Sequence, residues 1–341
     1  MANASKESQY IILLQQLEIS LKRGRYVRSH ELATRTLRLA EKYVQSDSWK
    51  NAEEVMQWLE NTADRLTKAA VSESAPSNVL KRLIKTVQED FMTRKNQGRM
   101  HTISRLDSDT KVDYSEELPD LRSDILGAIL DLSSELENGA ESIAEDAEKH
   151  INANEVIMTI GRSRTVEAFL KRAAKINKLE VIIVKCGPFY QGKDLAKSLT
   201  KSKIKTTLIN DTAAFSMMSR VDKIVIGTHT VLANGGLKAI AGCHQILLTA
   251  KYFNVPVLVL AASYKLSPEY PFSAEMKITN RFVSPEELID YKDGDMIDNV
   301  QVYAPVFDYV PPELVSLFIF NMGSHAPSYI HRLLHDTYTQ T

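Results

Sequence analysis

The sequence predicts an α/β protein with an α-helical amino-terminal domain, residues 1–150, followed by a doubly wound parallel-sheet domain, residues 151–341. Two observations carry this prediction. Up to about residue 150, apolar residues recur every three or four positions, as on one face of a helix. After that point, short runs rich in Val and Ile alternate with helical segments, a pattern typical of a parallel sheet covered on both faces.

Four helices are expected before residue 96. The first has one apolar face, formed by Ile11, Leu14, Leu17 and Leu21. Ser29 is the expected N-cap of the second, with the acidic Glu31 in its first turn. The third contains apolar positions from Ala52 to Leu66. Pro76 is expected in the first turn of the fourth, where its missing N–H is harmless.

A polar stretch, Asn96–Glu117, has few apolar anchors and is expected to be a loop within the first domain. A long helix follows. Its apolar stripe consists of Leu121, Ile125, Ile129, Leu132, Leu136, Ala140, Ile143 and Ala147. This stripe either packs on its own domain or forms a seam for a helix of a partner.

The second domain is expected to contain five strands, Val156–Ile160, Val181–Lys185, Thr206–Ile209, Lys223–Ile226 and Val257–Leu260. Helices are expected between them, at Val166–Ile176, Leu195–Ser202, Thr212–Met218 and His244–Phe253. Ligands of doubly wound sheets bind at the carboxyl ends of the strands. The loops that follow the strands are therefore the places where function is expected.

Composition narrows the class of function. Lys and Arg number 42 and Asp and Glu number 43, so the basic surplus of a nucleic-acid-binding protein is absent. The longest apolar run, Val255–Ala262, has eight residues, far from the ~20 that a membrane span needs. The first residues lack the order of a secretory signal. The two cysteines, Cys186 and Cys243, form neither a disulfide framework nor a zinc pattern. We expect a cytosolic protein with no direct contact to nucleic acid or membrane.

The loop after the first strand begins Gly161-Arg162-Ser163-Arg164. Ser163 is a candidate cap of the next helix. The free N–H groups and the two arginines either form an anion site or simply start a helix with solvated side chains. No Gly-x-Gly-x-x-Gly or Walker pattern occurs in the chain.

The next three loops each offer one polar candidate. Cys186 is expected to be a small buried residue, with a reactive thiolate as the alternative. Asn210-Asp211-Thr212 is expected to cap a helix, with Asp211 as a general base the alternative. His229 is expected to be structural, since no nucleophile or carboxylate accompanies it. Asn234-Gly235-Gly236 predicts a turn.

Four segments resemble one known family. They are NEVIMTIGRSRTVEAFL (Asn154–Leu170), GPFYQG (Gly187–Gly192), VDKIVIGTHTVLANGGLKAIAG (Val221–Gly242) and APVFDYVPPELVSLFIFNMGSHAPSYIHRLL (Ala304–Leu334). They are similar to the beta subunits of eukaryotic translation initiation factor 2B, within the regulatory family of alpha, beta and delta subunits. The resemblance implies a helical amino-terminal domain and a Rossmann-like doubly wound domain that serves subunit assembly.

The same family is related to sugar-phosphate isomerases such as methylthioribose-1-phosphate isomerase. Their chemistry uses a cysteine and an aspartate at two strand ends, and these positions fall on Gly161 and His229. The arginine that helps to hold phosphate falls on Gly187, whereas Asn234 is retained. The resemblance thus implies a degenerate pocket made of Gly161, Arg162, Arg164, Gly187, His229 and Asn234. No catalytic, cofactor-binding or metal-binding residue is expected.

By resemblance, the protein is a non-catalytic regulatory subunit of the guanine nucleotide exchange factor for initiation factor 2. Expected partners are the delta subunit, as a heterodimer, the alpha, gamma and epsilon subunits, and the alpha subunit of factor 2, whose phosphorylation it helps to sense. The alternatives are a sugar-phosphate isomerase and a homologue whose degenerate pocket still binds a sugar phosphate or nucleotide.

The carboxyl-terminal block is unusually apolar. Pro311 and Pro312 are expected to start a short helix with apolar residues on all sides. Such a helix is buried either inside the domain or against a partner subunit. The expected interface residues are Phe307, Tyr309, Leu314, Leu317 and Phe318.

Overall fold

The computed structural model describes residues 2–24, 28–98, 112–271, 280–286, 288–290, 292 and 294–338. The chain divides into two compact units. The first consists of residues 1–137 and 335–341, and the second of residues 138–334. The division falls inside a long helix, α5 (Leu121–Glu145).

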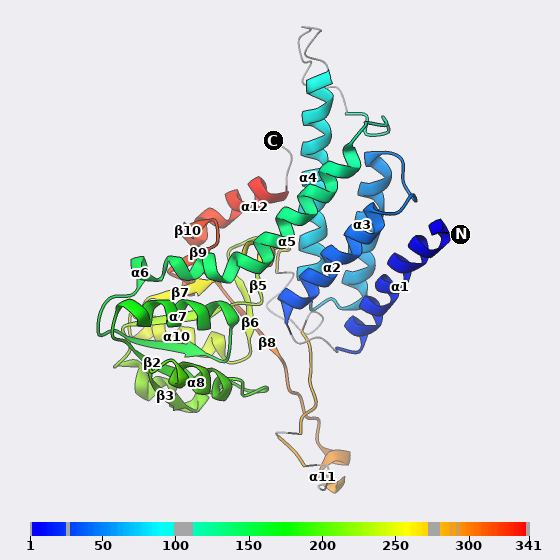
Figure 1. Ribbon diagram of the computed structural model, residues 1–341. Coiled ribbons are helices and arrows are strands. Elements are labelled where there is room, and N and C mark those ends of the chain that lie inside the picture. Colours follow the sequence, from blue (N-terminus) through cyan, green and yellow to red (C-terminus); the bar gives the residue numbers. More distant parts are fainter. Residues whose placement is uncertain are drawn as a thin grey trace. The chain divides into compact units, whose positions relative to one another are not determined.

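The first unit is helical, as the apolar periodicity predicts (Figure 1). Besides the first part of α5, it contains α1 (Ala2–Lys22), α2 (Ser29–Val44), α3 (Ala52–Ala69) and α4 (Ala75–Gly98). Their apolar faces meet in one core, to which each of the five helices contributes. Leu121, Ile125 and Ile129 of α5 are buried in this core, so this part of the apolar stripe packs on its own unit.

The ends of these helices test the expected caps and loop. Asn51 caps α3 by accepting a hydrogen bond from the Glu54 N–H, at 2.9 Å. The N-cap prediction for Ser29 is wrong: Ser29 is the first helical residue of α2, and Arg28 holds the cap position without a side-chain bond. Helix α4 continues through Gly98, so the loop starts later than residue 96. Residues 99–111 of that loop lie outside the described residues, and residues 112–120 form neither helix nor strand.

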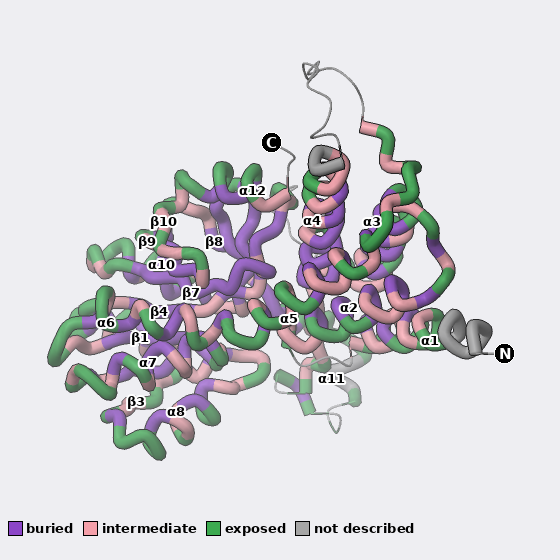
Figure 2. Tube along the Cα trace, turned by 45° about the horizontal axis from the view of Figure 1, so that its top comes forward, coloured by how far each residue is buried: buried purple, intermediate pink, exposed green. Residues whose placement is uncertain are grey.

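The second unit is built on a seven-stranded sheet with the order β10-β9-β7-β4-β1-β2-β3. Its strands are β1 (Val156–Ile160), β2 (Glu180–Val184), β3 (Lys205–Ile209), β4 (Lys223–Gly227), β7 (Val257–Leu260), β9 (Leu317–Phe320) and β10 (Gly323–His325). All neighbours are parallel except β10, which runs antiparallel to β9. The five predicted strands are confirmed to within one residue at each end. In Figure 2 the central strands are largely buried.

The predicted helices between the strands are also present. They are α7 (Arg164–Ile176), α8 (Gly192–Lys201), α9 (Ala214–Met218), which follows the 3-10 turn η1 (Asp211–Ala213), and α10 (Cys243–Tyr252). Helix α7 packs beside α8, and α9 beside α10. The strand order reverses between β1 and β4, which is the switch point where doubly wound sheets place their ligand sites.

A second, antiparallel sheet was not expected from the sequence. It has the order β5-β6-β8 and consists of β5 (Thr230–Val231), β6 (Leu237–Ile240) and β8 (Phe307–Val310). Short elements complete the unit: α6 (Ala147–His150), η2 (Ser263–Lys265), α11 (Gly294–Asn299), η3 (Pro312–Leu314) and η4 (Pro327–Tyr329). The last helix, α12 (Ile330–Tyr338), runs from this unit into residues of the first.

The predicted helix after Pro311 and Pro312 is wrong. The chain there makes only the 3-10 turn η3 and then strand β9, which pairs with β7 inside the large sheet. A strand that is covered on both faces is apolar at every position, and over so few residues this pattern is the same as that of a buried helix. Among the described residues, no helix has the length and apolar character needed to cross a bilayer.

Candidate functional site

Gly161 and Cys186, which follow the carboxyl ends of β1 and β2, lie side by side. Gly161 follows β1 with a φ of +62°, in the left-handed region that favours glycine. A Cβ atom on Gly161 would lie 3.7 Å from the Cβ of Cys186 and 3.9 Å from its Sγ. The side chain of Cys186, from the loop after β2, therefore occupies the space beside Gly161.

The environment of Cys186 disfavours a thiolate. The side chain is buried, and burial raises the pKa of its thiol to about 12, with further contributions from the carboxylates of Asp211 and Asp308. Burial also raises the pKa of Cys243 well above its ordinary value. Since the thiolate is the reactive form, neither cysteine is an activated nucleophile. This agrees with the expectation that Cys186 is a small buried residue.

Asp211 holds the loop after β2. Its Oδ1 accepts a hydrogen bond from the Cys186 N–H at 2.8 Å, and its Oδ2 accepts one from the Gly187 N–H at 3.1 Å. The predicted capping role of this segment is wrong, because Asn210 makes no side-chain cap bond and Asp211 binds the neighbouring loop. The sequence shows that Asp211 follows a strand end, but it does not show the partner, because Cys186 lies 25 residues away.

A second carboxylate, Asp308 of β8, holds the start of α10. Its Oδ2 accepts hydrogen bonds from the Gly242 N–H at 2.6 Å and the His244 N–H at 3.3 Å. Free N–H groups at a helix start are natural anion ligands, and here the chain supplies the anion itself. Sequence reasoning missed Asp308 because it lies in an apolar block, 66 residues from Gly242.

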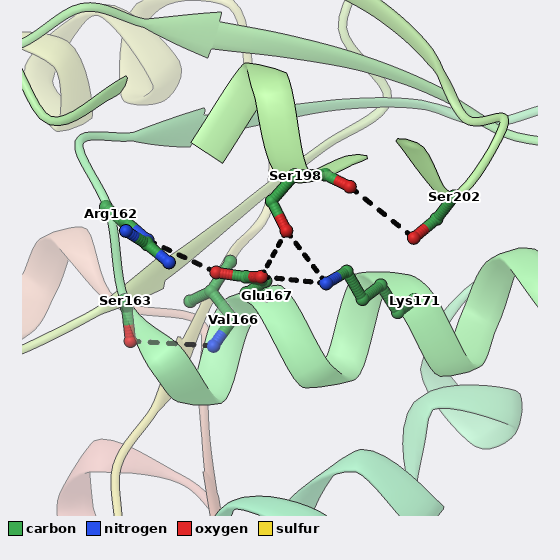
Figure 3. Close-up of polar contacts among 7 residues, drawn as sticks. All are labelled: Arg162, Ser163, Val166, Glu167, Lys171, Ser198 and Ser202. Atoms are coloured by element: carbon green, nitrogen blue, oxygen red, sulfur yellow. Dashed lines mark hydrogen bonds and ion pairs between the residues drawn. The ribbon is translucent and has the colours of Figure 1, made fainter. Parts of the chain in front are cut away.

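The first loop starts α7 as predicted. Ser163 accepts a hydrogen bond from the Val166 N–H at 3.5 Å, which confirms the cap (Figure 3). Gly227, the last residue of β4, makes room for this serine. A Cβ atom on Gly227 would lie 2.5 Å from Ser163 Oγ and 2.7 Å from Ser163 Cβ, closer than real contacts allow.

Arg162, one of the two arginines of this loop, pairs with a carboxylate of the chain itself. The Nε of Arg162 donates to Glu167 Oε2 at 3.2 Å. Glu167 also accepts hydrogen bonds from Lys171, at 2.8 Å, and from Ser198 (Figure 3). Burial acts to raise the pKa of Glu167, but these bonds and charges outweigh it and lower the pKa. Glu167 therefore already balances the charge of Arg162, while Arg164 is exposed as the first residue of α7.

His229 and Asn234 lie on either side of β5, the first strand of the smaller sheet. The His229 backbone N–H donates to the Lys238 carbonyl at 3.0 Å, and its ring lies 4.5 Å from the ring of Phe307. Asn234 forms the predicted turn between β5 and β6, where its Oδ1 accepts from the Gly236 N–H at 2.9 Å. Its Nδ2 donates to the Tyr309 hydroxyl at 2.7 Å. Both side chains thus have structural contacts with β8.

Lys265 is a second residue of this region that sequence reasoning missed. It lies in η2, after β7, and its Nζ donates to the Thr228 carbonyl at 2.8 Å, next to His229. Burial lowers the pKa of its ammonium group to about 8. No motif surrounds it in the sequence. Within the described ranges, no cluster of His, Cys, Asp and Glu has the arrangement of a metal site.

Three of the five expected interface residues are buried within the unit. Phe307, Leu314 and Phe318 are at most 8% exposed. Tyr309 and Leu317 are only partly buried. Contact of these residues with another subunit stays a prediction.

The chain is similar to proteins of one known family. The model of the initiation factor 2 subunit family matches residues 26–327. The chain therefore belongs to the initiation factor 2 subunit family. It is 35% identical to translation initiation factor eIF2B subunit beta of Dictyostelium discoideum, over 94% of this chain and 93% of that protein. The resemblance to beta subunits is thereby confirmed.

An isomerase and two solved structures complete the comparison. Ribose 1,5-bisphosphate isomerase of Archaeoglobus fulgidus is 31% identical over 62% of this chain and 67% of its own. The crystal structure of eIF2B beta from Chaetomium thermophilum has a TM-score of 0.76 at 22% identity and covers 98% of this chain and 95% of its own. A chain of the tetrameric eIF2B-beta2-delta2 complex from the same organism has a TM-score of 0.73 at 22% identity, with coverages of 95% and 94%. The two structural matches confirm the fold.

Proposed function

We propose that the protein is a non-catalytic regulatory subunit of the guanine nucleotide exchange factor that acts on translation initiation factor 2. Its similarity to the Dictyostelium beta subunit along nearly the whole chain carries this proposal. The strand-end chemistry supports it. Gly161 has no side chain that could react, and burial keeps the thiol of Cys186 protonated. The chain then contributes surfaces and geometry, and another subunit releases GDP.

The proposed partners are the delta subunit, with which the chain pairs, and the alpha, gamma and epsilon subunits. The complex named for beta and delta among the similar structures supports the first of these. The alpha subunit of factor 2 is the proposed substrate contact, through which phosphorylation is sensed. The cytosol is the proposed compartment, since translation initiation takes place there.

Native mass spectrometry of the tagged protein, purified gently from its own cells, tests this assembly. We expect stoichiometric recovery with one related α/β chain and with larger subunits. A GDP-release assay on factor 2 then compares assemblies with and without this chain, using unphosphorylated and phosphorylated factor 2. Recovery as a homodimer only, or equal GDP release in all four conditions, would contradict the proposal.

Leu317 provides a test of the proposed subunit interface, because it is one of the two expected interface residues that are only partly buried. Leu317→Asp should release the delta-like partner while the circular-dichroism spectrum stays native. Phe318→Ala is the matched control. Phe318 is fully buried in the next position of β9, so this variant should lose stability without a selective loss of the partner. Global unfolding of Leu317→Asp would assign Leu317 to the domain core.

A sugar-phosphate isomerase is the second candidate, favoured by the similarity to ribose 1,5-bisphosphate isomerase. The proposed correspondence of the isomerase cysteine and aspartate with Gly161 and His229 argues against it. Incubation of the purified protein with ribose 1,5-bisphosphate and methylthioribose 1-phosphate decides the matter, because any turnover supports an enzyme. Calorimetric titration with the same compounds and with nucleotides tests for a degenerate pocket that binds without reacting.

A further inference from the structure

Positive charge is concentrated in one part of the second unit. Residues 167–205 contain ten Lys and Arg against three Asp and Glu, a net charge of +7 in a chain whose net charge is −1. The segment comprises most of α7, β2, α8 and the start of β3. The whole-chain charge conceals this surplus, because the rest of the chain is acidic.

Helix α8 carries a stripe of three lysines on its outer face. Leu195 and Leu199 are buried on its inner face, and Ser198 points from the same side toward Glu167 of α7 (Figure 3). Lys193, Lys197 and Lys201 are exposed and follow one another at four-residue intervals. Residues at this spacing lie on one face of a helix, about 6 Å apart along its axis. The stripe is therefore about 12 Å long.

The stripe leads to a groove at the amino ends of β1, β2 and β3, opposite the strand ends discussed above. The groove has a volume of about 480 Å³. It is lined by Asn154, Val156, Ala174, Asn177, Lys178, Leu179, Glu180, Ser202, Lys203, Ile204 and Lys205. Its only carboxylate, Glu180, accepts a hydrogen bond from Lys205 at 2.7 Å. Lys178 and Lys203 remain as exposed cations at the same groove.

These five residues, Lys178, Lys193, Lys197, Lys201 and Lys203, are here called the lysine surface. In the described part of the chain, no carboxylate lies within ion-pair distance of any of them, whereas Lys171, Arg172 and Lys205 nearby are paired. Helix-end electrostatics account for Lys201, in the last turn of α8, but not for Lys193 at its start, where a cation is unfavourable. The acidic residue of α8, Asp194, is exposed beside Lys193 but forms no ion pair with the five lysines, so ion pairs among the described residues do not neutralise the cluster.

We propose that the lysine surface binds an extended, acidic segment of a partner protein. In an extended strand, alternate side chains point to one side about 6.6 Å apart, which matches the lysine spacing on α8. About four residues of such a segment cover the stripe, and the residues that follow them reach the groove. The groove walls also include the apolar side chains of Val156, Leu179 and Ile204, which suit the apolar side chains of a peptide.

The surface is less suited to a nucleic acid. Proteins that bind single strands stack bases on aromatic side chains, and none lines the groove. All five cations are lysines, so the planar fork with which arginine binds phosphate is missing.

Fluorescence anisotropy with the full chain, purified together with the subunits that accompany it, tests the proposal. The probe is a fluorescein-labelled peptide of eight glutamates, and a peptide of eight glutamines is the uncharged comparison. We expect the glutamate peptide to bind, to lose affinity as salt shortens the Debye length, and to bind at least tenfold more weakly to Lys193→Ala/Lys197→Ala/Lys201→Ala. The glutamine peptide should not bind.

The matched control replaces three exposed lysines outside the surface, as Lys50→Ala/Lys81→Ala/Lys251→Ala. It removes the same net charge and should keep the affinity of the unmodified chain. An equal loss in both triple variants, or no binding at low salt, would overturn the proposal. Tighter binding of an eight-nucleotide oligouridylate than of the glutamate peptide would overturn it in favour of RNA. Native circular-dichroism spectra of both variants ensure that the comparison concerns folded protein.

Discussion

At the scale of single residues, two partly buried carboxylates and two buried thiols shape the strand-end region. Asp211 and Asp308 each accept two backbone hydrogen bonds, one at the loop after β2 and one at the start of α10. Their negative charges add to burial in raising the pKa of Cys186. At the start of α10, where free N–H groups attract anions, the chain thus supplies the anion itself.

Alkylation measures the consequence for Cys186. Its pKa is raised from 9.0 to about 12, so the thiolate fraction at a given pH falls by about a thousandfold. In the folded Cys243→Ser variant at pH 8, iodoacetamide should therefore label Cys186 far more slowly than it labels the same protein in urea. Labelling of the native protein at the rate of a free thiol would contradict the buried, neutral state.

Lys265 predicts a pH dependence of stability. Its pKa is lowered from 10.5 to about 8, so between these values the unfolded chain binds more protons than the folded chain. Lys265 should therefore contribute a rise in the free energy of unfolding with pH, of about 1 kcal/mol between pH 8 and 9. Urea unfolding of Lys265→Met should lack this rise. Equal slopes for both proteins would exclude Lys265 as the cause. Both proteins share the opposite contribution of Cys186 and Cys243, whose raised pKa values make stability fall as the pH approaches and passes 9, so the difference between the two slopes isolates Lys265.

At the scale of elements, glycine determines how closely α7 approaches β4. Gly227 ends β4 at a point where a Cβ atom would overlap Ser163, the N-cap of α7. The first turn of the helix therefore rests directly on the end of the strand. This contact fixes the position of the loop that contains Gly161 and Arg162.

Gly227→Ala should lower the free energy of unfolding by about 1–3 kcal/mol, the usual cost of overpacking. Adding Ser163→Gly removes both overlapping atoms and should restore part of this loss in a double-mutant cycle, measured by urea unfolding. Gly127→Ala is the control. A Cβ atom there meets nothing within 4 Å, and in a helix the change should stabilise by about 0.5–1 kcal/mol. Additive effects at Gly227 and Ser163 would show that the overlap is not the cause.

At the scale of the whole molecule, the surface of the second unit includes an aromatic cluster. Phe215 of α9 is 54% exposed and Tyr252 of α10 is 73% exposed. Their ring centroids lie 5.7 Å apart, and Phe253 lies within 5.2 Å of Phe215 and 5.1 Å of Tyr252. Contiguous exposed apolar area of this kind promotes association of a chain that is expressed without its partners.

Light scattering after size-exclusion chromatography tests the effect of this cluster on the isolated chain. Phe215→Ser/Tyr252→Ser should lower the fraction of large aggregates, because it removes two of the three rings. Tyr270→Ser is the matched control, since Tyr270 is 59% exposed but lies outside the cluster. An equal effect of both variants would assign aggregation to general surface hydrophobicity.

The sequence by itself determined the helices of the first unit, five of the seven strands of the large sheet and the cap at Ser163. Each of these depends on apolar periodicity or on neighbours within a few positions, and such information is local. Residue identities also showed that Gly161 has no reactive side chain. The positive charge of residues 167–205 can also be counted in the sequence, although the net charge of the whole chain, −1, does not show it.

Only the tertiary structure decided which side chains meet at the strand ends. It placed Cys186 beside Gly161 and gave Asp211 and Asp308 backbone partners 25 and 66 residues away. It also showed that the carboxyl-terminal apolar block forms a strand. Strand β9 pairs with β7 and gains hydrogen bonds to a neighbouring strand, whereas a short isolated helix is only marginally stable. Contacts between distant segments depend on how the chain crosses itself, and no local pattern encodes that path.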